Sequence, residues 1–129
     1  MVAAIGSPDA YAGEVPVAYV QLADGARVSS EVLLSFAAER IPERAAVPKH
    51  IYVLERLPTT AVGKLFKPAL VQMEVARVLN EQAERNGLVI DASVVQDPKR
   101  GLVATLSGPD VARMRPLLSG YALQVDYVT

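Results

Sequence analysis

Short apolar runs dominate the first part of the chain, and their spacing predicts strands and one helix. Residues 2–5 are apolar and lead into Gly-Ser-Pro-Asp, which predicts a short buried strand followed by a turn. Residues 14–22 are apolar at both sets of alternating positions, which is typical of a central strand covered on both faces. Between residues 30 and 41, apolar side chains recur at helical spacing, after two serines that can cap a helix.

A proline at position 42 ends this helix, and an apolar run at residues 49–55 predicts the next strand. Strand, helix and strand in this order are typical of a right-handed crossover between parallel strands. Residues 57–67 combine small, polar and glycine positions and predict a loop. Pro68 suits the first turn of a helix, which we expect to run to about residue 85 before Asn86-Gly87 ends it.

Alternation of apolar and polar positions returns in the last third of the chain. It predicts strands at 88–95, 102–106 and 121–128, a hairpin loop at 96–101 and a short helix at 109–118. The complete order is ββαβαββαβ, so we expect a small α+β domain with a mixed sheet in two layers. The last six elements, counted from the strand at 49–55, follow the βαββαβ order of ferredoxin-like folds.

Composition excludes several kinds of function. The 129 residues carry a net charge of -1, no Cys and one His, so disulfide scaffolds and Cys- or His-rich metal sites are excluded and we expect no metal ligands. Mixed charge and only 5% aromatic residues argue against a nucleic-acid partner. No apolar run approaches the roughly 18–20 residues that span a bilayer, so we expect no transmembrane segment and a cytoplasmic protein.

The most informative loop sequence surrounds Lys64. A phosphate-binding P-loop is excluded, because Pro58 and Leu65 occupy positions where that motif needs Gly and Ser or Thr. A lysine on a small, glycine-bearing loop could still reach a ligand outside its own domain and offer a point charge to a phosphoryl or carboxylate oxygen. Taken alone, the same lysine fits a solvated loop residue better than a functional one.

The order of motifs around this loop resembles the C-terminal domain of the AMP-forming acyl-CoA synthetases, a superfamily that also holds peptide-synthetase adenylation domains and beetle luciferases. The resemblance covers about residues 3–70. It rests on Ala4-Ile5-Gly6-Ser7-Pro8-Asp9, then Gly13-Glu14-Val15-Pro16-Val17-Ala18, then the helix, then Val47-Pro48-Lys49, and finally Leu57-Pro58-x-Thr60-x-x-Gly63-Lys64.

This resemblance implies a two-step ligase that uses ATP, Mg²⁺ and coenzyme A. A carboxylic acid, expected to be a fatty acid, first reacts with ATP to form an acyl-adenylate and pyrophosphate, and coenzyme A then displaces AMP to give a thioester. Most of the ATP and acyl site would lie on a large N-terminal AMP-binding domain, over which the small domain rotates between the steps. Lys64 matches the catalytic adenylation lysine of the family, and Thr60 and Gly63 match the loop positions that shape its approach.

The chain also departs from the family. The large domain, the hinge residue and the first hairpin and helix of the small domain are missing, so we expect a fragment. Residues 1–70 would be the core of the C-terminal domain, truncated at its N-terminus, and residues 71–129 a helix plus ββαβ extension packed on it. We expect the isolated chain to be inactive and to bind no cofactor.

Other residues give weaker signals. Lys99 and Arg100 at a hairpin tip could contact a coenzyme A phosphate or simply be solvated. His50 could act as a base, but it more readily fits a satisfied strand end, and Glu14 fits a structural turn. The alternative function is a stand-alone ferredoxin-like module that regulates, binds a small ligand or forms a homodimer through residues 88–129.

Overall fold

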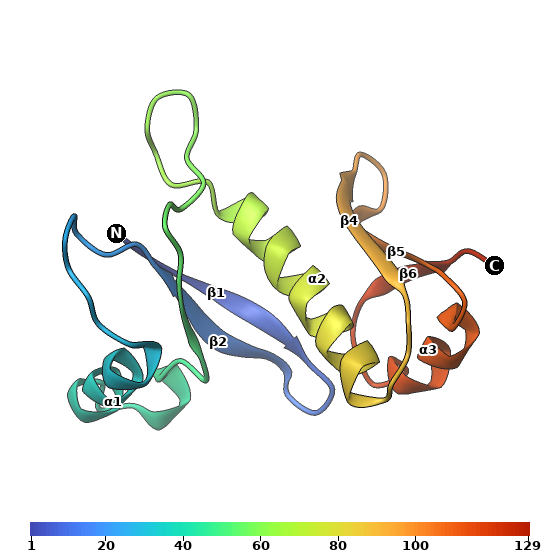
Figure 1. Ribbon diagram of the computed structural model, residues 1–129, viewed down its shortest axis with the longest axis horizontal. Coiled ribbons are helices and arrows are strands. Elements are labelled where there is room, and N and C mark those ends of the chain that lie inside the picture. Colours follow the sequence, from blue (N-terminus) through green and yellow to red (C-terminus); the bar gives the residue numbers. More distant parts are fainter. The chain divides into compact units, whose positions relative to one another are not determined.

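The computed structural model describes residues 1–129 and contains the ββαβαββαβ order expected from the sequence (Figure 1). The chain consists of two compact units, Met1–Ser7 with Val15–Val71 and Pro8–Glu14 with Gln72–Thr129. The elements are β1 (Val2–Asp9), β2 (Gly13–Val20), α1 (Ser30–Arg40), a 3₁₀ turn (Arg44–Ala46), β3 (Ile51–Val53), α2 (Lys67–Arg85), β4 (Asp91–Asp97), β5 (Gly101–Ser107), α3 (Val111–Leu117) and β6 (Gln124–Tyr127).

The sheet of the first unit has the order β1-β2-β3, so β2 is the central strand, as its apolar pattern predicts. Met1 and Gln21 exchange two backbone hydrogen bonds, of 2.9 and 2.8 Å, which is the pairing of antiparallel neighbours. The β2 and β3 strands are parallel, with Ala18 opposite Ile51. A crossover through α1 therefore joins them, as the strand–helix–strand order predicts.

Apolar clusters cover both faces of this sheet. On one face, α1 packs with its inner side chains Leu33, Leu34 and Ala37 against Ala18, Val20 and Ile51. On the other face, the buried cluster consists of Ala3, Ile5, Val17, Tyr19, Leu57 and Leu70, with Leu65 packed against it. Because side chains alternate along a strand, the run at residues 17–20 supplies both clusters.

The local signals for α1 are confirmed. Ser29 is the N-cap residue, and its Oγ accepts a hydrogen bond of 3.2 Å from the backbone N–H of Val32. The helix ends at Arg40, two residues before Pro42, with Ile41 as its C-cap. These two signals set the length of the helix that covers one face of the sheet.

The second unit contains a separate sheet with the order β4-β5-β6. The β4 and β5 strands form an antiparallel hairpin, whereas β5 and β6 are parallel and are joined through α3. Gly108 lies at the turn before α3 with a φ of +114°, and a Cβ atom there would come within 3.1 Å of the backbone of Ile90, so both conformation and space favour glycine. Many of the unit's apolar side chains are buried, among them Val75, Val78, Leu79, Val103, Leu106, Val111 and Met114.

One expectation needs correction. The first strand does not stop at residue 5, because β1 continues through the Gly-Ser-Pro segment to Asp9. The turn comes later, where Asp9 Oδ1 accepts hydrogen bonds of 2.9 Å from the N–H groups of Tyr11 and Ala12. Long pairing with β2 satisfies the backbone groups of the segment that local turn signals would otherwise interrupt.

The ferredoxin-like order of the last six elements, βαββαβ, is confirmed. Its first strand, β3, pairs with β2 in the first sheet, while β4, β5 and β6 form the other sheet. The six elements therefore do not share one sheet, because β3 has a partner earlier in the chain. None of the helices is long and apolar enough to cross a membrane.

Candidate active-site loop

The candidate catalytic lysine lies on a hairpin-like loop between β3 and α2, which projects beyond the sheet of its unit (Figure 1). Thr59 and Leu65 form an isolated antiparallel bridge across the loop. Phe66 closes its base by donating a backbone hydrogen bond of 2.9 Å to the carbonyl of Pro58. The loop is thus a short two-stranded structure, although the sequence predicted no pairing within it.

A tight turn at Thr60 to Gly63 forms the tip of this loop. The Gly63 N–H donates to the Thr60 carbonyl at 2.9 Å, and the Thr60 N–H donates to the Lys64 carbonyl at 2.6 Å. The Lys64 N–H donates in turn to Thr60 Oγ1 at 3.2 Å. Thr60 therefore holds the backbone on both sides of the turn, which is a structural basis for the Thr at this position.

Gly63 owes its place to backbone conformation. Its φ angle is +83°, in the left-handed region that side chains with a Cβ atom rarely adopt. The space around it is open, so crowding is not the reason for glycine. A turn followed by a left-handed glycine is a common three-residue hairpin connection, and here it leads directly into Lys64.

The base of the loop is apolar and anchored, whereas its tip is exposed. Leu57 is buried, and its N–H donates a hydrogen bond of 2.8 Å to the side-chain oxygen of Gln21. Leu65 packs against the apolar cluster beneath the sheet. Lys64 itself is exposed and makes no salt bridge, and Val62 beside it is 79% exposed. The base of the loop is therefore fixed, while its tip carries the positive charge of Lys64 without a salt-bridge partner.

The other two candidate cations, Lys99 and Arg100, lie at the β4–β5 turn in the second unit. Asp97 Oδ1 accepts hydrogen bonds from both of their backbone N–H groups, at 2.8 and 2.9 Å. The guanidinium of Arg100 binds both carboxylate oxygens of Asp126, at 3.0 and 2.6 Å. A phosphate would therefore compete with Asp126 for Arg100, and Lys99 is the freer cation of the two.

These contacts shift the acidity of both carboxylates. The pKa of Asp126 is lowered by its hydrogen bonds from the Arg100 side chain. The pKa of Asp97 is lowered by the backbone N–H groups of Arg100 and Lys99. Both carboxylates are only partly covered, so the shifts describe local pairing at the surface.

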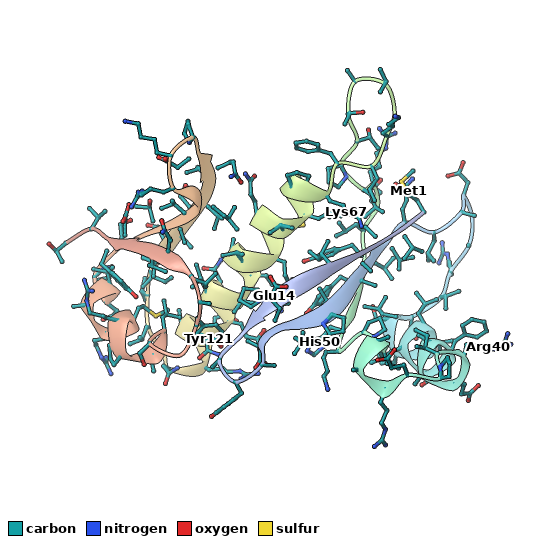
Figure 2. The ribbon with its side chains drawn as sticks, turned by 180° about the vertical axis from the view of Figure 1, so that it is seen from behind. Met1, Glu14, Arg40, His50, Lys67 and Tyr121 are labelled. Carbon is teal, nitrogen blue, oxygen red and sulfur yellow. The ribbon has the colours of Figure 1, made fainter.

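His50 and Glu14, the two weaker candidates, lie at strand ends (Figure 2). Glu14 is exposed at the second position of β2. The His50 ring precedes β3 and stacks on Tyr52, with ring centroids 5.9 Å apart. His50 also lines an open cavity of about 330 Å³ together with residues that include Ser30 and Glu31. Neither residue lies in the loop that carries Lys64.

A second hollow of about 650 Å³ lies beside the C-terminal half of α1. Its lining combines apolar side chains, among them Leu34, Ile41 and Val47, with the two cations Arg44 and Lys49. The chain contains no group of three or more His, Cys, Asp or Glu side chains that could hold a metal ion.

The sequence did not predict the contact of Gln21 with the loop. Its only signal is a polar residue near the end of an apolar run.

The chain is similar in sequence to proteins of a known family. Residues 1–64 match the family described as "AMP-binding enzyme C-terminal domain". Marinolic acid–CoA ligase from Pseudoalteromonas sp. (strain SANK 73390) is 39% identical over 109 residues, which are 83% of this chain and 17% of that ligase. Long-chain-fatty-acid–CoA ligase from Bacillus subtilis (strain 168) is 41% identical over 69 residues, 54% of this chain and 12% of that one.

Solved structures agree with these relatives. A fatty acyl CoA synthetase from Mycobacterium tuberculosis matches with a TM-score of 0.52 and 33% identity, over 59% of this chain and 15% of that chain. Apo MatB from Rhodopseudomonas palustris matches with a TM-score of 0.51 and 28% identity, over 56% and 14%. The chain spans about a sixth of the length of these proteins or less. Through residues 1–64, the chain belongs to the AMP-binding enzyme C-terminal domain family found in acyl-CoA ligases.

Proposed function

We propose that this chain is the C-terminal domain of an AMP-forming fatty acid–CoA ligase and that it supplies Lys64 to an ATP and acyl site on an N-terminal AMP-binding domain. The observation that carries the proposal is the loop itself. Lys64 lies at the last position of the family motif, immediately after a left-handed Gly63, on a tip that is exposed and free of any anionic partner.

The chemistry of the first step calls for such a group. A carboxylate must approach the α-phosphate of a nucleotide, and two anions repel each other. A lysine ammonium placed between them offsets the repulsion and stabilises the negative charge that develops in the transition state. Lys64 would do this from outside the nucleotide pocket, because its loop extends from a separate domain.

The construction of the loop suits this task. Thr60 makes three hydrogen bonds across the turn, so the backbone of Lys64 is already ordered before any ligand arrives. Leu57 and Leu65 fasten the base of the loop in the apolar cluster. A fixed backbone with a mobile four-carbon side chain delivers the charge with little loss of conformational entropy.

The N-terminal domain would bind most of ATP with Mg²⁺, the carboxylic acid and coenzyme A. ATP would supply the adenylate, and coenzyme A would supply the thiol. For the second step, rotation of this domain would withdraw Lys64 and bring other surfaces toward coenzyme A. Lys99 and Arg100 remain candidates for a coenzyme A phosphate, with Lys99 favoured because Arg100 pairs with Asp126. Residues 1–70 would form the core of the C-terminal domain, and residues 71–129 its extension.

Separate assays of the two half-reactions test the proposal. In the ligase assembled from this chain and its AMP-binding domain, Lys64→Ala should lower acyl-adenylate formation by about 10²–10³-fold. Formation of the thioester from supplied acyl-adenylate and coenzyme A should continue, because Lys64 would have left the site. Lys67→Ala is the matched control, since it removes an exposed lysine three residues away. Equal loss of both half-reactions in Lys64→Ala would contradict the proposed role.

A further inference from the structure

Gln21 joins the end of the central strand β2 to the base of the Lys64 loop. Its side-chain oxygen accepts a hydrogen bond of 2.8 Å from the N–H of Leu57, 36 residues further along the chain. We propose that Gln21 is a positioning residue, which sets the direction in which the loop carries Lys64. The catalytic part of this inference rests on the proposed function, whereas its structural part can be tested on the chain alone.

The backbone of Gln21 is already fixed, so its side chain is what reaches the loop. Its N–H donates to the Met1 carbonyl at 2.8 Å, and its carbonyl accepts from the Met1 amino group at 2.9 Å. Both bonds join the residue before β1 to the residue after β2, and so continue the pairing of these two strands. Because a backbone N–H is only a donor, the amide oxygen of Gln21 must face Leu57. The direction of the amide is therefore determined.

The hydrogen bond between Leu57 and Gln21 matters because it lies in a partly buried place. Leu57 is 4% exposed, and the bond itself is partly buried. A buried N–H without an acceptor costs about 1–3 kcal/mol, so losing the amide oxygen would favour a displaced loop base that lets water reach Leu57. An apolar contact alone would hold the Leu57 side chain without specifying the direction of its backbone.

Displacement at the loop base would be passed on to Lys64 through the pairing across the loop. The Pro58 carbonyl accepts from Phe66, Thr59 pairs with Leu65, and Thr60 holds Lys64. The second strand of the loop is attached differently, through the packing of Leu65. The loop base is thus held by the polar contact at Gln21 in addition to the apolar packing of Leu57 and Leu65.

Two variants separate the hydrogen bond from the bulk of the side chain. Gln21→Met keeps a similar length and volume but removes the acceptor, whereas Gln21→Glu keeps an acceptor oxygen. Gln124→Met is the matched control, because it removes an exposed glutamine in β6, in the other unit. Amide hydrogen exchange measured by NMR on the 129-residue chain reports the result directly.

We expect Gln21→Met to speed exchange at Leu57 by about tenfold or more and to shift the amide resonances of Thr60 and Lys64. Exchange at Tyr19 in β2 should be unchanged, and Gln21→Glu should restore slow exchange at Leu57. Unchanged exchange at Leu57 in Gln21→Met would overturn the inference. So would an equal acceleration at Leu57 and Tyr19, which would report general unfolding instead of loop displacement.

The catalytic part is tested in the assembled ligase, with Lys64→Ala measured alongside. Gln21→Met should slow acyl-adenylate formation by about tenfold, leave thioester formation from supplied acyl-adenylate unchanged, and be rescued by Gln21→Glu. If Lys64→Ala is inactive in the first step while Gln21→Met is fully active, the positioning role is wrong and the proposed function stands. If Lys64→Ala is fully active, the proposed function and the catalytic part fail together, and the exchange data alone decide the structural part.

Discussion

Lys64 depends on neighbours whose own side chains need not touch a substrate. Thr60 holds the backbone on both sides of the turn, and Gly63 adopts a φ of +83° that the turn requires. The glycine was recognisable from the sequence because backbone conformation is a local property. The hydrogen bonds of Thr60 were not, since they depend on how the loop folds back on itself.

Replacing Gly63 with alanine tests the turn at the scale of one residue. Alanine in the left-handed region costs about 1–2 kcal/mol, so Gly63→Ala should lower the urea midpoint and shift the Lys64 amide resonance. Gly25→Ala is the control, because Gly25 has a φ of +79° and equally open surroundings at a turn outside the loop. We expect both variants to lose similar stability, and only Gly63→Ala to shift the Lys64 amide resonance. A shift of that resonance in both variants would show that Gly63 has no specific role in the turn.

Helix α1 and the β4–β5 hairpin illustrate the scale of single elements. The boundaries of α1 followed from Ser29 and Pro42, because capping and proline geometry act within a few residues. The β4–β5 hairpin was likewise predictable, with its turn at Asp97 to Gly101. The length of β1 was not, because its pairing with β2 outweighs the local signals of a Gly-Ser-Pro segment.

Removal of the helix cap should weaken the whole first unit. Ser29→Ala deletes the acceptor for the Val32 N–H, which should cost about 1 kcal/mol of unfolding free energy. Ser35→Ala, at an exposed position within the same helix, should change stability far less. Urea unfolding followed by circular dichroism measures both variants, and equal effects would contradict a specific role of the cap.

The Arg100–Asp126 ion pair gives a pH dependence with a definite sign. Because the folded-state pKa of Asp126 is lowered, its contribution to stability is present above the unfolded-state pKa and is lost as pH falls through the folded-state pKa. In Arg100→Met, an NMR titration should show the pKa of Asp126 rising toward its ordinary value. Asp97 serves as the internal comparison and should move less, since backbone N–H groups that methionine retains lower its pKa more than the charge of Arg100 does. An unmoved Asp126 would rule out Arg100 as the cause.

The whole chain combines a family domain with additional sequence. The family match ends at residue 64, yet the similarity to the marinolic acid ligase covers 83% of the chain and so extends into the second unit. That unit has its own sheet and its own buried side chains. The chain spans only 17% of that relative, so its proposed catalysis depends on a much larger partner domain.

The corresponding prediction is that the 129-residue chain alone has no ATP–pyrophosphate exchange activity with fatty acids. It carries Lys64 but not the nucleotide and acyl pockets that we assign to the N-terminal domain, and a single lysine cannot bind ATP productively. A radiolabelled exchange assay measures this, with the assembled ligase as the positive control. Exchange by the isolated chain would contradict the proposal.

The order of elements, the capped helix and the Lys64 loop with its Gly63 could be determined from the sequence by itself. Each depends on interactions within a few residues or on a motif with fixed spacing. Only the tertiary structure decided that β3 joins β2 instead of β4 to β6, that Arg100 pairs with Asp126, and that Gln21 holds Leu57. These are pairings between residues far apart in the sequence. Which partner each residue takes depends on which hydrogen-bonding groups the folded chain brings near it and leaves without another partner.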